Sequence, residues 1–368
     1  MAEFLYWFIL ISISYFLVLF SYMHFSYKKE VFNNFFGFGA LFLTFTIIII
    51  IELLMFQDIT LYFETIPIFS LALGLPLLII GAIVLISSGF LFLFKLVFRN
   101  KDFSKFWNSL DEKTRKRSKL RGDTYRKIPH ILIFLGLFVV WYLGVDFVRT
   151  LSGSISGMIP DDNNMFHLFL KILSEPNSIS EVLFSLGWFY YLIFFFFYGF
   201  CFIILANELT RKVRFFAFPF NFLCNILLCE EEKKGYGTYL YFAIGQMVAA
   251  LITPPMVFLT ILGISSIADL ATSQLGIRFG KNKIRWNKEK SWQGSIAGII
   301  ACFIICFFFI GIPWAFIFSF AFLLFDIFTK KPIDISDNLL IPIGSSLIYL
   351  FIRFFFNFDY YTIILTWI

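Results

Sequence analysis

Long runs of apolar residues alternate with short polar segments along this chain. Runs of this length with few charges are typical of helices that cross a bilayer, because unpaired backbone groups cannot face lipid. The period-two alternation that marks barrel strands is not seen. The pattern therefore predicts an all-α, polytopic membrane protein with about 10 transmembrane helices. The predicted spans are residues 4–26, 35–56, 66–98, 128–149, 181–206, 237–252, 256–277, 293–309, 313–328 and 339–356.

Three interruptions modify this pattern. The run at residues 66–98 is longer than one span needs, and its glycines and proline are expected to kink or tilt it. The pair Pro254-Pro255 divides two shorter spans. Residues 215–229 are apolar but contain Pro219 and Asn221, which indicates a re-entrant or interfacial segment and not a full crossing.

Composition agrees with a membrane domain. The 368 residues are 60% hydrophobic with a mean hydropathy of +0.84, far above a soluble domain. No polar segment is long enough to build a second core. The first apolar run has no basic segment before it and no small-residue cleavage site after it, so we expect a retained span. The five cysteines show no zinc-like spacing, and no disulfide framework is expected.

The charges of the loops predict an orientation. Residues 99–127 and 278–290 are strongly basic, whereas residues 150–180 are mostly acidic. Because cytoplasmic loops carry an excess of Lys and Arg, we expect an outside N-terminus and cytoplasmic basic loops. Residues 215–229 then cannot cross the membrane, since a crossing would invert every later loop. The basic segment at residues 99–127 either binds anionic headgroups or acts only as a topology determinant.

With this topology, the unusual polar residues fall at the cytoplasmic ends of the spans. Asp269 lies about two turns inside its span, so roughly 12 Å deep. Ionisable groups within a membrane are expensive and are candidates for function. The rival reading is that polar residues always collect at helix ends, which explains Asp326 well and Asp269 poorly. The residues at these ends include Arg126, Lys127, His130, Asn207, Glu208, Asp269, Lys290, Ser291, Gly294, Asp326, Asp337 and Asn338.

The stretch at residues 265–298 combines an intramembrane acid with a basic loop flanked by glycines. A metal-bound polyphosphate would need such a combination. The run from Gly276 through Gly280, Lys281 and Asn282 is one residue too short for a P-loop and ends in Asn. The motifs of soluble serine hydrolases, zinc proteases and dinucleotide-binding folds are absent.

These motifs together resemble a known family, the CTP-dependent lipid kinases, which comprises dolichol kinase, phytol kinase and the CTP-dependent diacylglycerol kinase. Order and spacing match over residues 126–350, and residues 1–120 carry no motif of the family. Gln293 stands where the family usually has Glu. The matching motifs are Arg126-Lys127-Ile128-Pro129-His130, residues 269–281 with Asp269, Gly276, Gly280 and Lys281, then Lys290-Ser291-Trp292-Gln293-Gly294-Ser295, and Asp337-Asn338-Leu339-Leu340-Ile341-Pro342.

The resemblance implies transfer of the γ-phosphate of CTP to the hydroxyl of a membrane lipid alcohol. It divides the chain into N-terminal helices with a basic loop at residues 1–120 and a catalytic domain at residues 121–368. Asp337 or Asp269 is the candidate base. The implied roles are catalysis by Asp269, Asp337, His130 and Arg126, nucleotide binding by Lys127, Gly276, Gly280, Lys281, Lys290, Ser291, Gly294 and Asn338, and Mg²⁺ binding by Asp269, Asp337 and Glu208.

The resemblance also sets the expected partners, which are CTP, a lipid alcohol and the bilayer, with no nucleic acid. Arg285-Trp286 favours dolichol or another polyprenol, while phytol-like and diacylglycerol-like alcohols stay open, as does the oligomeric state. The expected location is the endoplasmic reticulum or the cell membrane, with the active site facing the cytoplasm. The alternatives are a cytidylyltransferase that makes a CDP-lipid from a lipid phosphate, and a transporter. No internal repeat supports a transporter.

Overall fold

The computed structural model describes residues 33–37, 39–44, 66–97, 119–152, 188–212, 216–221, 228, 235–329, 331–356, 358 and 360. Within these ranges the chain is helical and forms no strand, which confirms the all-α prediction. Short helical pieces lie at residues 33–37 and 39–44. The named helices are α4 (Ile66–Val97), α6 (Lys119–Ser152), α9 (Trp188–Lys212), α12 (Thr238–Ile252), α13 (Pro255–Gly263), η1 (Ile264–Ala268), α14 (Asp269–Phe279), α15 (Trp292–Ile310), α16 (Ile312–Phe328) and α17 (Asp337–Phe356).

Six helices among the described residues are long and apolar enough to cross a membrane. Helices α12 and α16 are apolar but shorter. The membrane prediction is thus confirmed, whereas a count of about ten spans is not. The first predicted span, at residues 4–26, lies outside the described residues. The six segments are Leu75–Phe94, Gly122–Leu143, Leu192–Arg211, Pro255–Phe279, Trp292–Ile310 and Asp337–Phe356.

Some of the prolines separate helices and others lie within them. The division at Pro254-Pro255 is confirmed, because α12 ends at Ile252 and Pro255 occupies the first turn of α13. Pro76 and Pro129, in contrast, lie inside continuous helices. As a result α6 begins at Lys119, nine residues before the predicted start of the 128–149 span.

Of the segment predicted to be interfacial or re-entrant, residues 216–221 and 228 are described. Residues 216–221 contain a turn, in which the Asn221 amide donates to the Phe218 carbonyl at 3.0 Å. The Ala217 amide donates to the Ser88 hydroxyl of α4 at 3.0 Å. Thr210 of α9 also donates to the Asn221 side chain at 3.1 Å. This part of the segment therefore folds back onto α4 and α9, and the rest lies outside the described residues.

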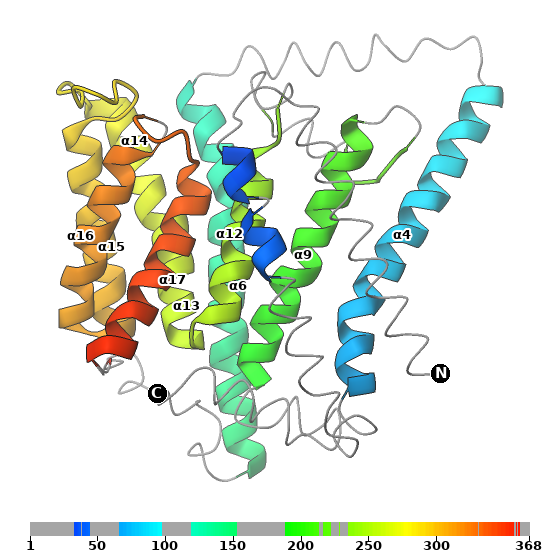
Figure 1. Cartoon of the computed structure of the whole chain (residues 1–368), viewed down its shortest axis with the longest axis horizontal. Helices are drawn as coiled ribbons and strands as arrows, with labels where there is room; N and C mark the ends of the chain where they lie inside the picture. The colour runs from blue at the N-terminus through cyan, green and yellow to red at the C-terminus, as the bar shows by residue number, and fades with distance from the viewer. Residues whose placement is uncertain are drawn as a thin grey trace.

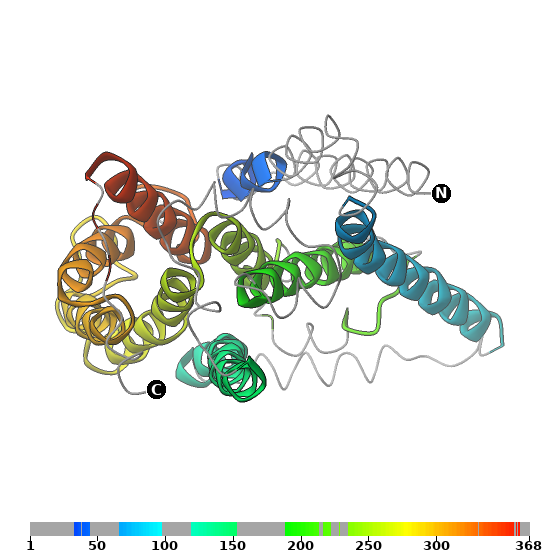
Figure 2. The same ribbon diagram turned by 90° about the horizontal axis from the view of Figure 1, so that it is seen from below.

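Successive spans run in opposite directions through the bundle, and α13, η1 and α14 together form one such span (Figure 1). The starts of α6, α12, α15 and α17 lie at its upper end in that view, together with the ends of α9 and α14. Seen from below, α14, α15 and α16 form a tight group, α12 is central, and α4 lies at the opposite edge against α9 (Figure 2). Every helix end that the sequence marked as polar therefore meets the others at one end of the bundle.

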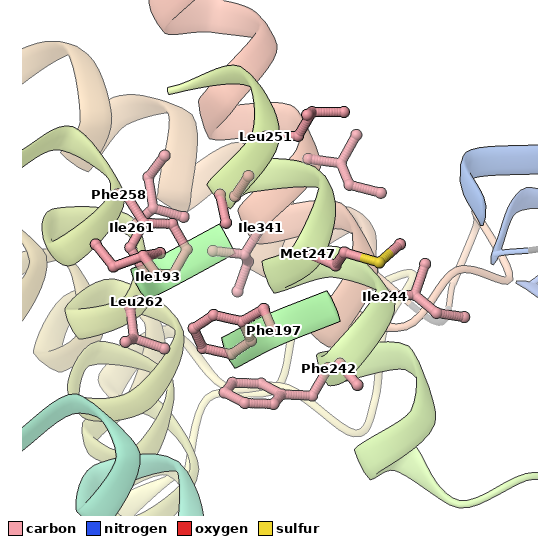
Figure 3. Packing of buried hydrophobic residues seen from close by; sticks show 14 of the residues in the cluster. Ile193, Phe197, Phe242, Ile244, Met247, Leu251, Phe258, Ile261, Leu262 and Ile341 are labelled. Atoms are coloured by element: carbon pink, nitrogen blue, oxygen red, sulfur yellow. The ribbon is translucent and has the colours of Figure 1, made fainter. Parts of the chain in front are cut away.

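The core lies around α12 and α13, whose apolar side chains face other helices on nearly every side (Figure 3). Phe197 of α9 contacts Phe258 of α13 edge-on, with ring centroids 5.2 Å apart. Helix α17 approaches α12 closely at Gly245, where an added Cβ would lie 2.5 Å from the Asn338 carbonyl oxygen. Small residues permit such close helix contacts in lipid, where packing and not water expulsion drives association.

Candidate active site

A cavity of about 590 Å³ opens among the starts of α6 and α17, the helix α14 and the loop that follows it. Its walls carry both cationic and acidic side chains. It brings together residues from motifs that lie far apart in the chain, from Arg126 to Asn338. The residues predicted as functional that line it are Arg126, Lys127, His130, Asp269, Gly276, Gly280, Lys290, Ser291, Asp337 and Asn338.

Asp269 is held in the cavity wall by an ion pair with Lys127. Asp269 is the first residue of α14 and is only 2% exposed, and Lys127 of α6 is 6% exposed. An isolated charge at such a site is costly, so each group compensates the other. The buried charge of Asp269 is therefore neutralised by a cation that lies 142 residues away in the sequence.

A single π-helical turn precedes Asp269. Residues 264–268 widen the helix, and the Ser266 hydroxyl donates to the backbone carbonyl of His130 at 3.1 Å. The Ser265 hydroxyl donates to the Ile261 carbonyl at 2.9 Å, within its own helix. Such turns are often found at functional sites, because they redirect the side chains that follow. The sequence analysis missed this turn, and its only signal was the Ser265-Ser266 pair before the acid.

Lys290 forms the second charged centre. Its ammonium group lies 2.6 Å from Asp326 Oδ1 and 3.5 Å from Asp337 Oδ2. Burial alone would lower the pKa of Lys290, but the two carboxylates outweigh it and hold this pKa above the ordinary lysine value. The other Asp326 oxygen accepts from the Ser295 hydroxyl at 2.5 Å. Asp326, which the sequence analysis assigned to a helix end, therefore positions Lys290.

Asp123 is a further acid that sequence reasoning missed. It accepts from Arg126 at 2.9 Å and from two residues of α14, Ser273 at 2.5 Å and Gln274 at 3.2 Å. It thus ties the start of α6 to α14 and orients the Arg126 guanidinium beside the cavity. The available signal was its spacing, because residues three apart on a helix are neighbours.

His130 lies one turn beyond Arg126 and is 7% exposed. Its ring stacks on Phe242 of α12, with centroids 3.7 Å apart and planes inclined by 8°. Its Nδ1 atom is buried and has no hydrogen-bond partner within the described part of the chain. The ring is thereby fixed in orientation while it lines the cavity.

The predicted glycines lie where α14, its loop and α15 approach one another. A Cβ at Gly280 would meet the Ser291 side chain, with Oγ at 2.5 Å, and would overlap the Gly276 carbonyl. Ser291 is the N-cap of α15 and accepts from the Gly294 amide at 3.3 Å. A Cβ at Gly294 would lie 2.6 Å from the Thr272 carbonyl, so this glycine permits the crossing of α14 and α15. Gly294 is not among the cavity-lining residues.

Lys281 and Glu208 also do not line the cavity. Lys281 is exposed. The Glu208 carboxylate is buried, where it pairs with Arg211 at 2.6 Å and accepts from the Gly237 amide at 3.2 Å and from the Tyr239 hydroxyl. It thus joins α9 to the start of α12. Among the described residues, no group of three or more His, Cys, Asp or Glu side chains is arranged to hold a metal ion.

The N-terminal segment contributes one residue that carries no motif. Asn33 is 5% exposed, lines the cavity and accepts from the Ser336 amide at 2.9 Å. This bond restrains the backbone immediately before Asp337. The cavity therefore takes residues from both sides of the predicted boundary between residues 120 and 121.

The chain matches no known protein-family model, no curated protein and no solved structure. The resemblance to the CTP-dependent lipid kinases accordingly rests on the motifs alone.

Proposed function

We propose that this protein is an integral membrane kinase that transfers the γ-phosphate of CTP to the hydroxyl of a membrane lipid alcohol, with dolichol or another polyprenol as the first candidate. The observation that carries the proposal is the cavity itself. Its volume of about 590 Å³ lies within the range of small-molecule sites. It also gathers the residues of all four motifs into one place.

The charges around the cavity suit phosphoryl transfer, which depends mainly on positioning and on neutralising phosphate charge. Arg126, Lys127 and Lys290 line it from α6 and from the loop before α15. All three cations are already held by carboxylates, so they are oriented before a ligand arrives. A preorganised charge loses little energy to reorganisation during the reaction. Lys127 and Lys290 would bind the triphosphate, and Arg126 would contact the transferred group.

The residues present also fit a Mg²⁺ ion. Mg²⁺ is usually held by one or two carboxylates together with substrate phosphates and water. Asp269 and Asp337 both line the cavity and are the carboxylates that would hold it. Bound there, the ion would neutralise charge on the phosphates. Glu208 is not included in this set, because it does not line the cavity.

The acceptor hydroxyl needs a base that can take its proton. Asp337 is the better placed candidate, because its carboxylate is 17% exposed and that of Asp269 is 3% exposed. The Asn33–Ser336 hydrogen bond and the Lys290 ammonium group both restrain the region around Asp337. The lipid would enter from the bilayer with its hydroxyl at the polar end of the helices.

We further propose that the cavity faces the cytoplasm in a molecule of about ten spans. The loop between α14 and α15 lies at the cavity end of the bundle (Figure 1) and is basic. An excess of Lys and Arg is the usual mark of the cytoplasmic side.

The deciding experiment combines purified protein, Mg²⁺, γ-labelled CTP or ATP and a panel of lipid alcohols. We expect label to move from CTP to one alcohol, and Asp269→Asn or Asp337→Asn to reduce the rate by about 10²–10³, as for other electrostatic catalytic groups. Lys290→Gln and Lys281→Gln form a matched pair, because both remove a charge from one loop and only Lys290 lines the cavity. Lys281→Gln should retain most of the activity.

Other outcomes would replace the proposal. Release of pyrophosphate with a lipid phosphate as substrate would identify a cytidylyltransferase. Turnover that persists in both aspartate variants would remove the assigned roles. Absence of nucleotide turnover with every alcohol and lipid phosphate tested would exclude both enzymes.

A further inference from the structure

The loop between α14 and α15 carries more cations than the cavity uses. Five basic side chains in and just before this loop are exposed, and Glu289 is the only acid among them. We call these five residues the loop surface. They are Arg278, Lys281, Lys283, Arg285 and Lys288.

The loop is firmly held. The Ile284 amide donates to the Lys290 carbonyl at 3.2 Å, and the Trp292 amide donates to the Asn282 carbonyl at 3.0 Å. The Asn287 side chain is fully buried and donates to the Thr329 carbonyl, beyond α16, at 2.7 Å. These hydrogen bonds fix the backbone that carries the loop surface and join it to the end of α16.

The five cations of the loop surface are not paired within the described part of the chain. In the described part of the chain, none of the five side chains forms an ion pair or a hydrogen bond. Lys290, the remaining cation of the loop, contrasts with them, because it is bound by Asp326 and Asp337. Like charges held close together repel one another, so an external anion would stabilise this arrangement.

Exposed aromatic side chains accompany the loop surface. Phe279 ends α14 and is 61% exposed, and Trp292 begins α15 and is 41% exposed. Trp286, at the middle of the loop, is 46% exposed and donates its indole N–H to the Ile327 carbonyl at 3.2 Å. Exposed Trp residues at helix ends are typical of the membrane–water interface. The five cations lie within a few residues of these aromatic side chains along the sequence.

We propose that the loop surface binds the phosphate-bearing headgroups of anionic phospholipids in the surrounding leaflet. Each Lys or Arg near an anionic membrane surface strengthens binding several-fold, and this effect is lost within a Debye length. Lys283 also lines the cavity, so bound headgroups would lie beside its mouth. The inference does not depend on the proposed reaction, because the other four cations do not line the cavity and Lys283 is assigned no role in the reaction.

The test measures energy transfer from the protein's tryptophans to dansyl-labelled phosphatidylglycerol or phosphatidylcholine with the same acyl chains, in detergent micelles. The wild type should prefer phosphatidylglycerol, and the preference should weaken as salt is added. Arg278→Gln/Arg285→Gln/Lys288→Gln should lower the preference on the order of a hundredfold. None of these three residues lines the cavity.

The matched control is Arg278→Lys/Arg285→Lys/Lys288→Arg, which keeps every charge and should keep the preference. Glu289→Gln adds one net positive charge and should raise it. An unchanged preference in the neutralised variant, or an equal loss in the charge-preserving one, would overturn the proposal. So would displacement of phosphatidylglycerol by inorganic triphosphate but not by sulfate of equal ionic strength, because the surface would then be a polyphosphate site.

Discussion

At the scale of single residues, two lysines organise the cavity. Lys127 neutralises Asp269, and Lys290 neutralises Asp326 and approaches Asp337. Each lysine comes from a different element from its acids. A buried charge that loses its partner is far more costly than a pair that is lost together. These pairs therefore stabilise the arrangement of helices as well as orienting the groups that would bind phosphate.

The Lys127–Asp269 pair leads to a prediction about stability. Lys127→Met should lower the free energy of unfolding by about 3–5 kcal/mol, because it leaves the Asp269 charge buried without a partner. Lys127→Met/Asp269→Asn should cost less than the sum of the two single changes. Thermal unfolding in detergent, followed by intrinsic fluorescence, measures the three values. Strict additivity would show that the two side chains do not interact.

Lys290 leads to a prediction about pH. Its raised pKa means that the stability supplied by its charge is complete below the ordinary lysine pKa and is lost only as pH rises through the raised value. Lys290→Arg has a guanidinium that keeps its proton. Wild type and Lys290→Arg should therefore show the same change of unfolding temperature with pH between about pH 7 and pH 9. A wild-type stability that falls in this range while the Arg variant's does not would contradict the assigned charge state.

At the scale of elements, close helix crossings determine where the cavity residues lie. Helix α12 meets α17 at Gly245, beside the Asn338 carbonyl and Pro342. Helix α14 meets α15 at Gly294, and the π-helical turn before Asp269 fits α14 against α6. The apolar pattern could place these helices along the chain, since hydropathy is a local property. It could not identify their neighbours, which depend on contacts between distant segments.

The α12–α17 crossing gives a test with an internal control. A Cβ at Gly245 would lie 2.5 Å from the Asn338 carbonyl oxygen and 2.6 Å from Pro342 Cγ, so Gly245→Ala must push the helices apart. We expect a loss of about 1–3 kcal/mol in the free energy of unfolding and reduced activity. Gly136→Ala on α6 meets no atom within 4 Å and should be neutral or slightly stabilising. Equal effects of the two changes on thermal unfolding would show that α12 and α17 do not depend on close packing at Gly245.

At the scale of the whole molecule, most of the motif residues lie together around one cavity, whereas the residues that support them were not identified from the motifs. Ten residues chosen from motif order line one cavity, because each motif opens or closes a helix at the same end of the bundle. Asp123 and Asn33 were missed and Asp326 was assigned only to a helix end, since no pattern in the sequence links an acid or amide to a partner on another helix. Lys281 was predicted to bind the nucleotide and Glu208 to bind Mg²⁺, but neither lines the cavity. Only the side-chain geometry could reveal this.

The arrangement of the bundle makes one last prediction, which concerns its two ends. Lys288 lies in the loop at the cavity end, whereas Ile312 follows the turn between α15 and α16 at the other end (Figure 1). Both side chains are exposed.

Lys288→Cys and Ile312→Cys should therefore react with a membrane-impermeant maleimide from opposite sides of sealed vesicles. If the basic loop is cytoplasmic, Lys288→Cys should be labelled in inverted vesicles only. Wild type measures the background from the five native cysteines, of which Cys201, Cys302 and Cys306 are buried. Labelling of both variants from one side would contradict the helix arrangement, and labelling on opposite sides with Lys288→Cys outside would reverse only the orientation.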